Sequence, residues 1–207
     1  MPKQRIAVIG SGNIGGTLAE KWVAAGHPVI FGARDPSSPR ESTTKLRPGA
    51  RVATIDDAVE AADVVLLAVP GRAMPDVVSG IGTALNGRIV IDAANRIGEP
   101  SLNSLADIAI AAPDARAYRA FNIYGWENFR EPTFGHEPAD LFFAGPEGAS
   151  RSVVEGLISD VGLRPVWVGG PEEAGAVDAL LALWFTLAGK RGMGRHLAFR
   201  LLGDSRS

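Results

Sequence analysis

Residues 5–15, with the sequence RIAVIGSGNIG, decide the fold of this chain. Within them, residues 6–9 form a short apolar run that predicts a buried β-strand. This run leads directly into a Gly-x-Gly-x-x-Gly turn, and apolar residues at helical spacing follow it. Strand, glycine turn and helix in this order form the context that a dinucleotide-binding fingerprint requires.

Each glycine of the turn has its own expected purpose. Gly10 allows the tight turn, Gly12 lets backbone N–H groups approach a pyrophosphate, and Gly15 lets the helix pack closely on the strand. The unpaired N–H groups at the helix N-terminus then face the anion. A plain strand-to-helix turn is the alternative, but the flanking elements favour nucleotide binding. We expect contacts from six residues: Gly10, Ser11, Gly12, Asn13, Ile14 and Gly15.

The end of the second apolar run, residues 28–32, indicates which dinucleotide binds. A chain that binds NAD should carry Asp or Glu there, to bond the ribose 2′-OH. This chain has Ala33 in that place and Arg34 after it. A small residue leaves room for a 2′-phosphate, and a guanidinium binds phosphate through a fork of charge-assisted bonds. The sequence therefore favours NADP(H) over NAD(H).

Charged residues that follow this strand bear on the same choice. Arg40 and Lys45 lie in the next polar loop and could add positive charge. Asp35 is the counter-argument, since a shift of one residue would place it at the ribose. We expect it instead to turn away beside Pro36 and to fix the loop.

Composition excludes several classes of protein. The 207 residues suit one compact unit, which we divide into an NADP-binding domain at 1–170 and a C-terminal helical cap at 171–207. A net charge of −2 argues against a nucleic-acid surface, and the absence of cysteine excludes disulfides and fits a reducing cytosol. The three histidines show no ligand spacing, so no metal site is expected. No signal peptide or membrane span is recognisable, so we expect a cytoplasmic protein.

The remaining chain alternates between strand and helix patterns. Further strands are expected at 51–54, 63–69, 88–93, 116–122, 140–144 and 164–168, with helices at about 74–85, 102–111 and 150–161. Residues 172–202 should be helical and broken into two helices at Gly189, Gly192 and Gly194. This pattern predicts an α/β fold of the Rossmann type, doubly wound around a mainly parallel sheet, with a small C-terminal helical cap.

Ligands of such sheets bind outside the carboxyl ends of the strands. Ordinary strand-to-loop turns are the alternative there, but these positions adjoin the glycine turn. We expect further cofactor contacts from four residues: Val69, Pro70, Ala93 and Asn95. Asn122 and Tyr124, after the sixth strand, are the candidate catalytic residues. Asn122 either bonds an acceptor ring or carboxamide, or caps a turn; Tyr124 either stacks on the ring or belongs to the core.

The chain resembles the NADPH-dependent F420 (deazaflavin) reductase family over essentially its full length. The matching stretches include the glycine turn, residues 32–35 and the Gly192-Met193-Gly194 segment. The resemblance implies NADPH at the glycine turn with Arg34 on the 2′-phosphate. It also implies a deazaflavin or flavin against the nicotinamide, between the sixth-strand loop and the C-terminal helices. The family has a histidine where this chain has Asn122; the Ala-Phe-Asn version also resembles the oxidoreductase domain of STEAP metalloreductases.

These observations predict an enzyme that transfers hydride between NADP(H) and F420 or a flavin. Such transfer needs orientation more than side-chain chemistry, and no carboxylate dyad or His–Asp pair is expected among the strand-end residues. An NADP-dependent dehydrogenase or imine reductase is the alternative enzyme, and a non-catalytic NADP-binding redox sensor is the alternative of another class. The apolar excess of residues 176–202 predicts a homodimer.

Overall fold

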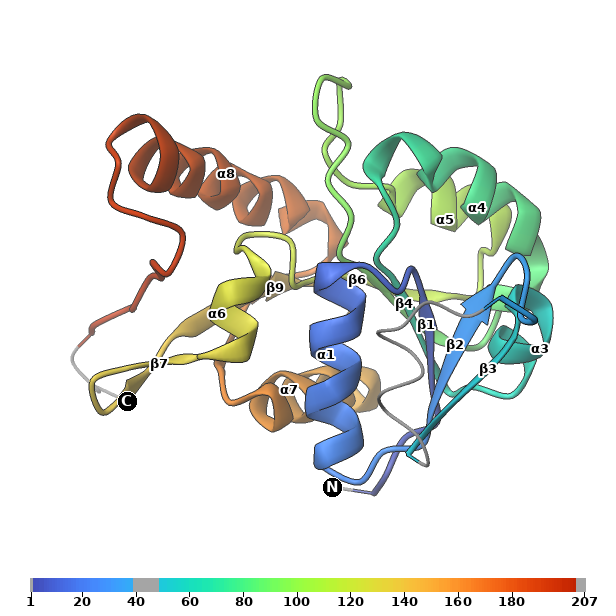
Figure 1. The fold of residues 1–207 in the computed structure, drawn as a ribbon. Coiled ribbons are helices and arrows are strands. Elements are labelled where there is room, and N and C mark those ends of the chain that lie inside the picture. Colours follow the sequence, from blue (N-terminus) through green and yellow to red (C-terminus); the bar gives the residue numbers. More distant parts are fainter. Residues whose placement is uncertain (1, 39–48, 204–207) are drawn as a thin grey trace.

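An eight-stranded sheet forms the centre of the computed structural model, which describes residues 2–38 and 49–203 (Figure 1). The strand order is β10-β9-β6-β5-β4-β1-β2-β3. All neighbours run parallel except β6 and β9. The expected mainly parallel sheet is therefore confirmed. The strands are β1 (Ile6–Ile9), β2 (Val29–Ala33), β3 (Ala50–Thr54), β4 (Val64–Leu67), β5 (Ile89–Asp92), β6 (Arg116–Arg119), β9 (Asp140–Ala144) and β10 (Arg164–Gly169).

Helices cover both faces of this sheet, as the doubly wound class requires. On one face α1 contacts α6 and α7, and on the other α4 contacts α3 and α5 (Figure 1). The central strands β1, β4 and β5 are therefore buried along their whole length, which explains their nearly continuous apolar sequences. The helices are α1 (Asn13–Ala24), α3 (Ile55–Glu60), α4 (Met74–Ile81), α5 (Leu105–Ala111), α6 (Trp126–Arg130), α7 (Ala149–Val161) and α8 (Ala174–Phe185).

Shorter elements connect these layers. Three of them are 3₁₀ turns: η1 (Gly71–Ala73), η2 (Gly82–Leu85) and η3 (Pro171–Glu173). A two-stranded hairpin, β7 (Thr133–Phe134) and β8 (Glu137–Pro138), was not expected from the sequence. Helix α8 begins after the last strand of the sheet and contacts β9.

The sixth strand is shorter than the sequence indicates. It ends at Arg119 rather than at Asn122, because Phe121 adopts a left-handed φ of 63° that no extended strand can continue. The unusual backbone directs the Phe121 ring into the core, where it packs edge-to-face on Trp22 and Phe129. Such a conformation costs about 1–2 kcal/mol for a residue with a Cβ, so the packing must offset it.

The expected second C-terminal helix does not form. A short π-helix, η4 (Thr186–Lys190), continues α8, and residues 191–203 then have no regular secondary structure. Gly192 and Gly194 take left-handed φ values of 69° and 87°, which end the helix. The tail instead bonds to β9, since Asp140 N donates to Phe199 O at 3.0 Å.

Across residues 2–38 and 49–203, the helices are too short or too polar for any of them to traverse a bilayer.

Candidate functional site

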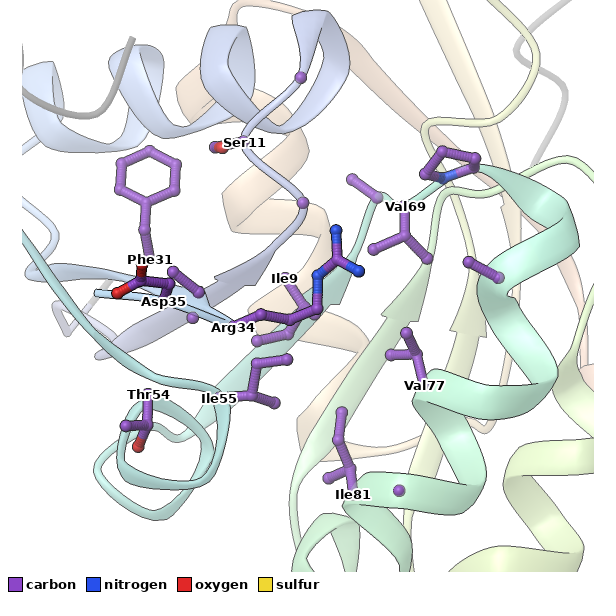
Figure 2. Close-up of a pocket in the computed structure, with 18 of the residues that line it drawn as sticks. Ile9, Ser11, Phe31, Arg34, Asp35, Thr54, Ile55, Val69, Val77 and Ile81 are labelled. Carbon is purple, nitrogen blue, oxygen red and sulfur yellow. The ribbon is translucent and has the colours of Figure 1, made fainter. Parts of the chain in front are cut away.

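A large cleft of about 1540 Å³ opens at the carboxyl ends of β1, β2 and β4 (Figure 2). Helix α4 forms its far wall, with Val77 and Ile81 facing inward (Figure 2). The cleft lies where open α/β sheets bind their ligands. Nine of the expected cofactor-binding residues line it: Gly10, Ser11, Gly12, Asn13, Ile14, Ala33, Arg34, Val69 and Pro70.

The glycine loop has the backbone geometry that its sequence predicts. Gly10 has a φ of 111°, and a Cβ there would lie 2.4 Å from Ala68 O. Gly15 does not line the cleft; a Cβ there would lie 1.9 Å from Gly10 O, so this glycine permits helix α1 to pack on the loop. Both positions therefore require glycine for the fold itself.

Gly12 differs from these two glycines. Its φ is −74°, which any residue can adopt, and a Cβ there would meet no protein atom within 4 Å. It precedes Asn13, the first residue of α1, and no side chain caps this helix N-terminus. The fold itself therefore does not require glycine at residue 12. The open space above Gly12, beside backbone N–H groups and the positive end of the helix dipole, fits a phosphate group.

Arg34 is exposed, and its side chain extends across the cleft toward Val69 (Figure 2). Asp35 turns to its own loop, where it accepts hydrogen bonds from the Ser37 hydroxyl at 2.6 Å and the Ser37 N–H at 3.0 Å. These bonds lower the pKa of the Asp35 carboxyl. Asp35 therefore fixes the loop, as expected. Arg40 and Lys45 lie outside the described residues.

One cation of the cleft, Arg72, was not expected from the sequence, nor were most of the residues that α3 and α4 contribute to its walls. Arg72 lies in η1, two residues after Pro70. A basic residue just beyond an apolar strand end was the available signal. The other unforeseen lining residues include Thr54, Ile55, Asp56, Asp76, Val77, Gly80 and Ile81.

Besides Gly15, four expected site residues do not line this cleft: Ala93, Asn95, Asn122 and Tyr124. Ala93, Asn122 and Tyr124 are buried, and Asn95 is half-buried. They lie beyond the ends of β5 and β6, in or beside a group of mutually bonded polar side chains that we call the polar edge. It consists of Asp92, Asn95, Asn103, Arg119, Asn122 and Asp178.

Arg119 is the centre of the polar edge and is fully buried. Its Nε donates to Asp178 Oδ1 at 2.7 Å, and its Nη1 lies 3.3 Å from Asp92 Oδ1. Its Nη2 donates to Asn95 Oδ1 at 2.6 Å, and Nη1 also donates to the Ala94 carbonyl. Asp92 ends β5 and Asp178 lies in α8, so the pair is not a dyad among the strand-end residues, where none was expected. Two carboxylates converge on this guanidinium, because a buried charge needs charged or hydrogen-bonded partners.

The two carboxylates are held differently. Asp92 accepts from Ala94 N at 3.0 Å and Ser104 N at 2.7 Å, yet its burial raises the pKa of its carboxyl despite the nearby Arg119. Asp178 comes from α8 and accepts from Asn103 Nδ2 at 2.7 Å. It is the one charged residue between Ala174 and Gly189, and such isolation in an apolar helix is a signal of buried pairing. Through it, the polar edge joins α8 to the sheet.

Asn122 and Tyr124 are engaged within the protein. The Asn122 amide donates to Asp178 Oδ1 at 3.0 Å, while its Oδ1 is buried without a hydrogen-bond partner. The Tyr124 hydroxyl donates to Asp140 O at 2.7 Å and accepts from Phe199 N at 2.9 Å, and burial raises its pKa. The structure thus places Tyr124 in the core, the alternative open from the sequence. Contact of either residue with an acceptor stays a prediction.

No group of three or more His, Cys, Asp or Glu side chains that could hold a metal ion occurs within residues 2–38 and 49–203.

The fold and the cleft define a Rossmann-type dinucleotide-binding protein. Residues 5–96 match the sequence profile of a family described as "NADP oxidoreductase coenzyme F420-dependent". The expected resemblance is thereby confirmed.

Two curated proteins are similar to this chain in sequence. The metalloreductase STEAP3 of Rattus norvegicus is 24% identical over 87% of this chain and 37% of its own length. A glycerol-3-phosphate dehydrogenase [NAD(P)+] of Chlorobium phaeobacteroides is 27% identical over 86% of this chain and 59% of its own length. The chain thus spans less than two thirds of these curated relatives.

Among solved structures, a candidate F420-dependent NADP reductase from Arthrobacter sp. FB24 superimposes with a TM-score of 0.82 at 23% identity. The match covers 97% of this chain and 100% of the other, and it shows that the two share a fold.

Proposed function

We propose that this protein is an NADP-dependent oxidoreductase that transfers hydride between NADP(H) and a deazaflavin (F420) or flavin. The observation that carries the proposal is Arg34, which extends into the cleft beside Ala33, where an NAD-binding chain would have an acid. The family match of residues 5–96 supports the same class of reaction. Together they favour NADP(H) as the resident dinucleotide.

The cleft fits this dinucleotide in two respects. The unfilled space above Gly12 can hold the pyrophosphate, with the N-terminal N–H groups of α1 as donors. Arg34 can bind the 2′-phosphate in a fork of two charge-assisted bonds, and Ala33 leaves room for it. Val69 and Pro70 line the cleft after β4, on the side where β4 pairs with β5.

NADPH, when bound, supplies a hydride from its nicotinamide ring. The chain contributes orientation and electrostatics rather than a proton donor or acceptor. The two carboxylates of the polar edge, Asp92 and Asp178, are engaged by Arg119. We propose that the acceptor binds beside Ala93, Asn95 and the segment 122–126, with Asn122 nearest to the reacting rings.

Steady-state NADPH oxidation tests this proposal directly. The purified protein is assayed with F420, FMN, FAD and riboflavin in turn, and with NADH in place of NADPH. We expect turnover with at least one of these acceptors and preference for NADPH. Binding of NADPH without turnover of any acceptor would contradict the proposed reaction and indicate the non-catalytic redox sensor instead.

The similarity to a glycerol-3-phosphate dehydrogenase favours a second candidate, an NADP-dependent dehydrogenase or imine reductase of small substrates. Hydroxyacid dehydrogenases place a Lys and an Asn on the first helix after the nucleotide-binding domain, and residues 172–178 contain neither. Reduction of small ketones or cyclic imines with NADPH, in the absence of flavin turnover, would establish this candidate.

A homodimer is the further part of this proposal. The outward side of α8 carries only uncharged residues, including Ala176, Ala179, Leu183 and Phe185, all exposed. A second copy of the chain would remove this apolar face from water. Sedimentation or elution at micromolar concentrations should give the mass of two chains, and a monomer throughout that range would contradict it. A cytoplasmic location also stays a prediction.

A further inference from the structure

Two guanidinium groups line the cleft, and they come from opposite sides of the glycine loop. Arg34 directly follows β2, and Arg72 lies in the turn η1 that follows β4. Strand β1, which leads into the glycine loop, pairs with β2 on one side and with β4 on the other. The two arginines therefore flank the expected pyrophosphate position.

The turn that carries Arg72 is fixed by its neighbours. Ala73 N donates to Pro70 O at 2.8 Å, which closes the turn. A Cβ on Gly71 would lie 2.1 Å from Asn95 O, so the turn packs tightly against the β5–α5 connection. At its other end, the β4 segment contacts the glycine loop, where a Cβ on Gly10 would lie 2.4 Å from Ala68 O. Arg72 thus projects from a backbone that is held on both sides.

Arg72 has no partner of its own within the described part of the chain. Its side chain is exposed and forms no hydrogen bond or ion pair there. Three carboxylates line the same cleft: Asp35, Asp56 and Asp76. Asp35 is held by Ser37, and Asp76, one helical turn after Arg72, does not approach it within ion-pair distance. The Arg72 guanidinium is therefore available to a ligand.

The strand order decides which group of the ligand it can reach. A dinucleotide that lies across the glycine loop has its adenosine ribose on the β2 side, where Arg34 stands. The β4 side then faces the pyrophosphate and the nicotinamide half. NADP and NAD differ only by the 2′-phosphate, so every group on the β4 side is common to both.

We propose that Arg72 binds the pyrophosphate of the dinucleotide from the side opposite the α1 N-terminus, and so adds affinity for NADP and NAD alike. This assignment rests on the proposed function. The two cations then have different roles: Arg34 distinguishes NADP from NAD, and Arg72 strengthens the binding of either cofactor.

Calorimetric titration of matched variants tests the division. Wild type, Arg34→Gln, Arg72→Gln and Arg72→Lys are each titrated with NADPH, NADH, ADP-ribose and 2′-AMP. ADP-ribose carries the pyrophosphate without the 2′-phosphate, and 2′-AMP carries the 2′-phosphate without the pyrophosphate. Arg191→Gln is the control, because Arg191 is also exposed but does not line the cleft.

We expect Arg72→Gln to weaken NADPH, NADH and ADP-ribose by a similar factor of roughly ten, and to leave 2′-AMP unchanged. Arg72→Lys should lose less, because it keeps the charge. Arg34→Gln should weaken NADPH and 2′-AMP only, and Arg191→Gln should resemble wild type.

Two results would overturn the assignment of Arg72 while leaving the proposed function intact. In the first, Arg72→Gln lowers affinity for NADPH and 2′-AMP selectively, which would place Arg72 at the 2′-phosphate. In the second, the variant binds all four ligands as wild type does. Failure of the wild type to bind either dinucleotide would instead refute the proposed function, and with it this inference.

Discussion

The cleft and the polar edge lie side by side at the carboxyl end of one sheet, yet their arginine side chains differ in burial and in bonding. In the cleft, Arg34 and Arg72 are exposed and have no ion-pair partner in the described chain. In the polar edge, Arg119 is fully buried and every nitrogen of its guanidinium donates a hydrogen bond. The exposed cations of the cleft are available to a ligand, whereas the buried cation of the polar edge is fully bonded within the fold.

Burial explains this difference. Water solvates an exposed guanidinium at little cost, so a charge on a cleft wall can await an anionic ligand. A buried charge must find its partners within the chain, because its desolvation costs several kcal/mol. The polar edge meets that demand with residues from β5, β6, α8 and the β5–α5 connection, which rises above the sheet in Figure 1.

Loss of Arg119 should have the largest effect on the fold. Arg119→Met would leave Asp92 and Asp178 buried without their cation, and we expect the free energy of unfolding to fall by about 3–5 kcal/mol. Urea denaturation followed by circular dichroism measures it. Arg116→Met, on the same strand but exposed, is the control and should cost well under 1 kcal/mol. Equal losses in the two variants would break the contrast between the regions.

Gly12→Val should have the opposite signature. A Cβ at residue 12 would have no protein atom within 4 Å and needs no unusual φ, so the thermal midpoint should stay close to wild type. The added side chain would occupy the space proposed for the pyrophosphate, and NADPH affinity should fall at least a hundredfold, or about 2.7 kcal/mol. Fluorescence titration beside a thermal melt measures both. Wild-type affinity in this variant would show that the loop is merely structural.

Arg34→Ala should change selectivity without affecting stability. Removal of its charge-assisted bonds should weaken NADPH roughly ten- to a hundredfold and leave NADH nearly unchanged. Titration of wild type and variant with both cofactors gives the ratio. Equal affinity of the wild type for NADH and NADPH would refute the proposed preference for NADPH.

Tyr124→Phe should give the smallest effect, and it tests whether Tyr124 is a core residue or part of an acceptor site. The variant loses bonds to Asp140 O and Phe199 N, so the unfolding free energy should fall by about 1–2 kcal/mol. A core residue should leave NADPH affinity and acceptor KM unchanged at a temperature where the variant is folded. A selective rise in acceptor KM, matched by Asn122→Ala, would instead support a role at the acceptor site.

Elements close in sequence were predicted well, and elements that depend on distant contacts were not. The glycine loop, the Ala33-Arg34 pair and the outward turn of Asp35 all follow from short-range rules of backbone and charge. The early end of β6 depends on Phe121, whose strained φ is offset by packing on Trp22, about one hundred residues earlier in the chain. No local sequence pattern predicts a positive φ at this phenylalanine.

The C-terminal segment shows the same limit. Its glycines correctly indicated a break after α8, but not that residues 191–203 would bond to β9 instead of forming a second helix. Tyr124 and Asp140 supply the partners for Phe199 and Leu201, and those partners lie at least 60 residues away. The apolar content of this segment therefore predicted more helix than the structure contains.

The sequence was sufficient to predict the first strand–turn–helix unit, the glycine loop and the place of Arg34, the cation proposed to favour NADP. Each depends on neighbouring residues and on fixed backbone stereochemistry. Tertiary packing determines which charged side chains remain exposed to a ligand and which are paired inside the fold. Asp92, Arg119 and Asp178 become one buried group because folding brings β5, β6 and α8 together. Arg72 becomes a wall of the nucleotide cleft because β4 pairs with β1.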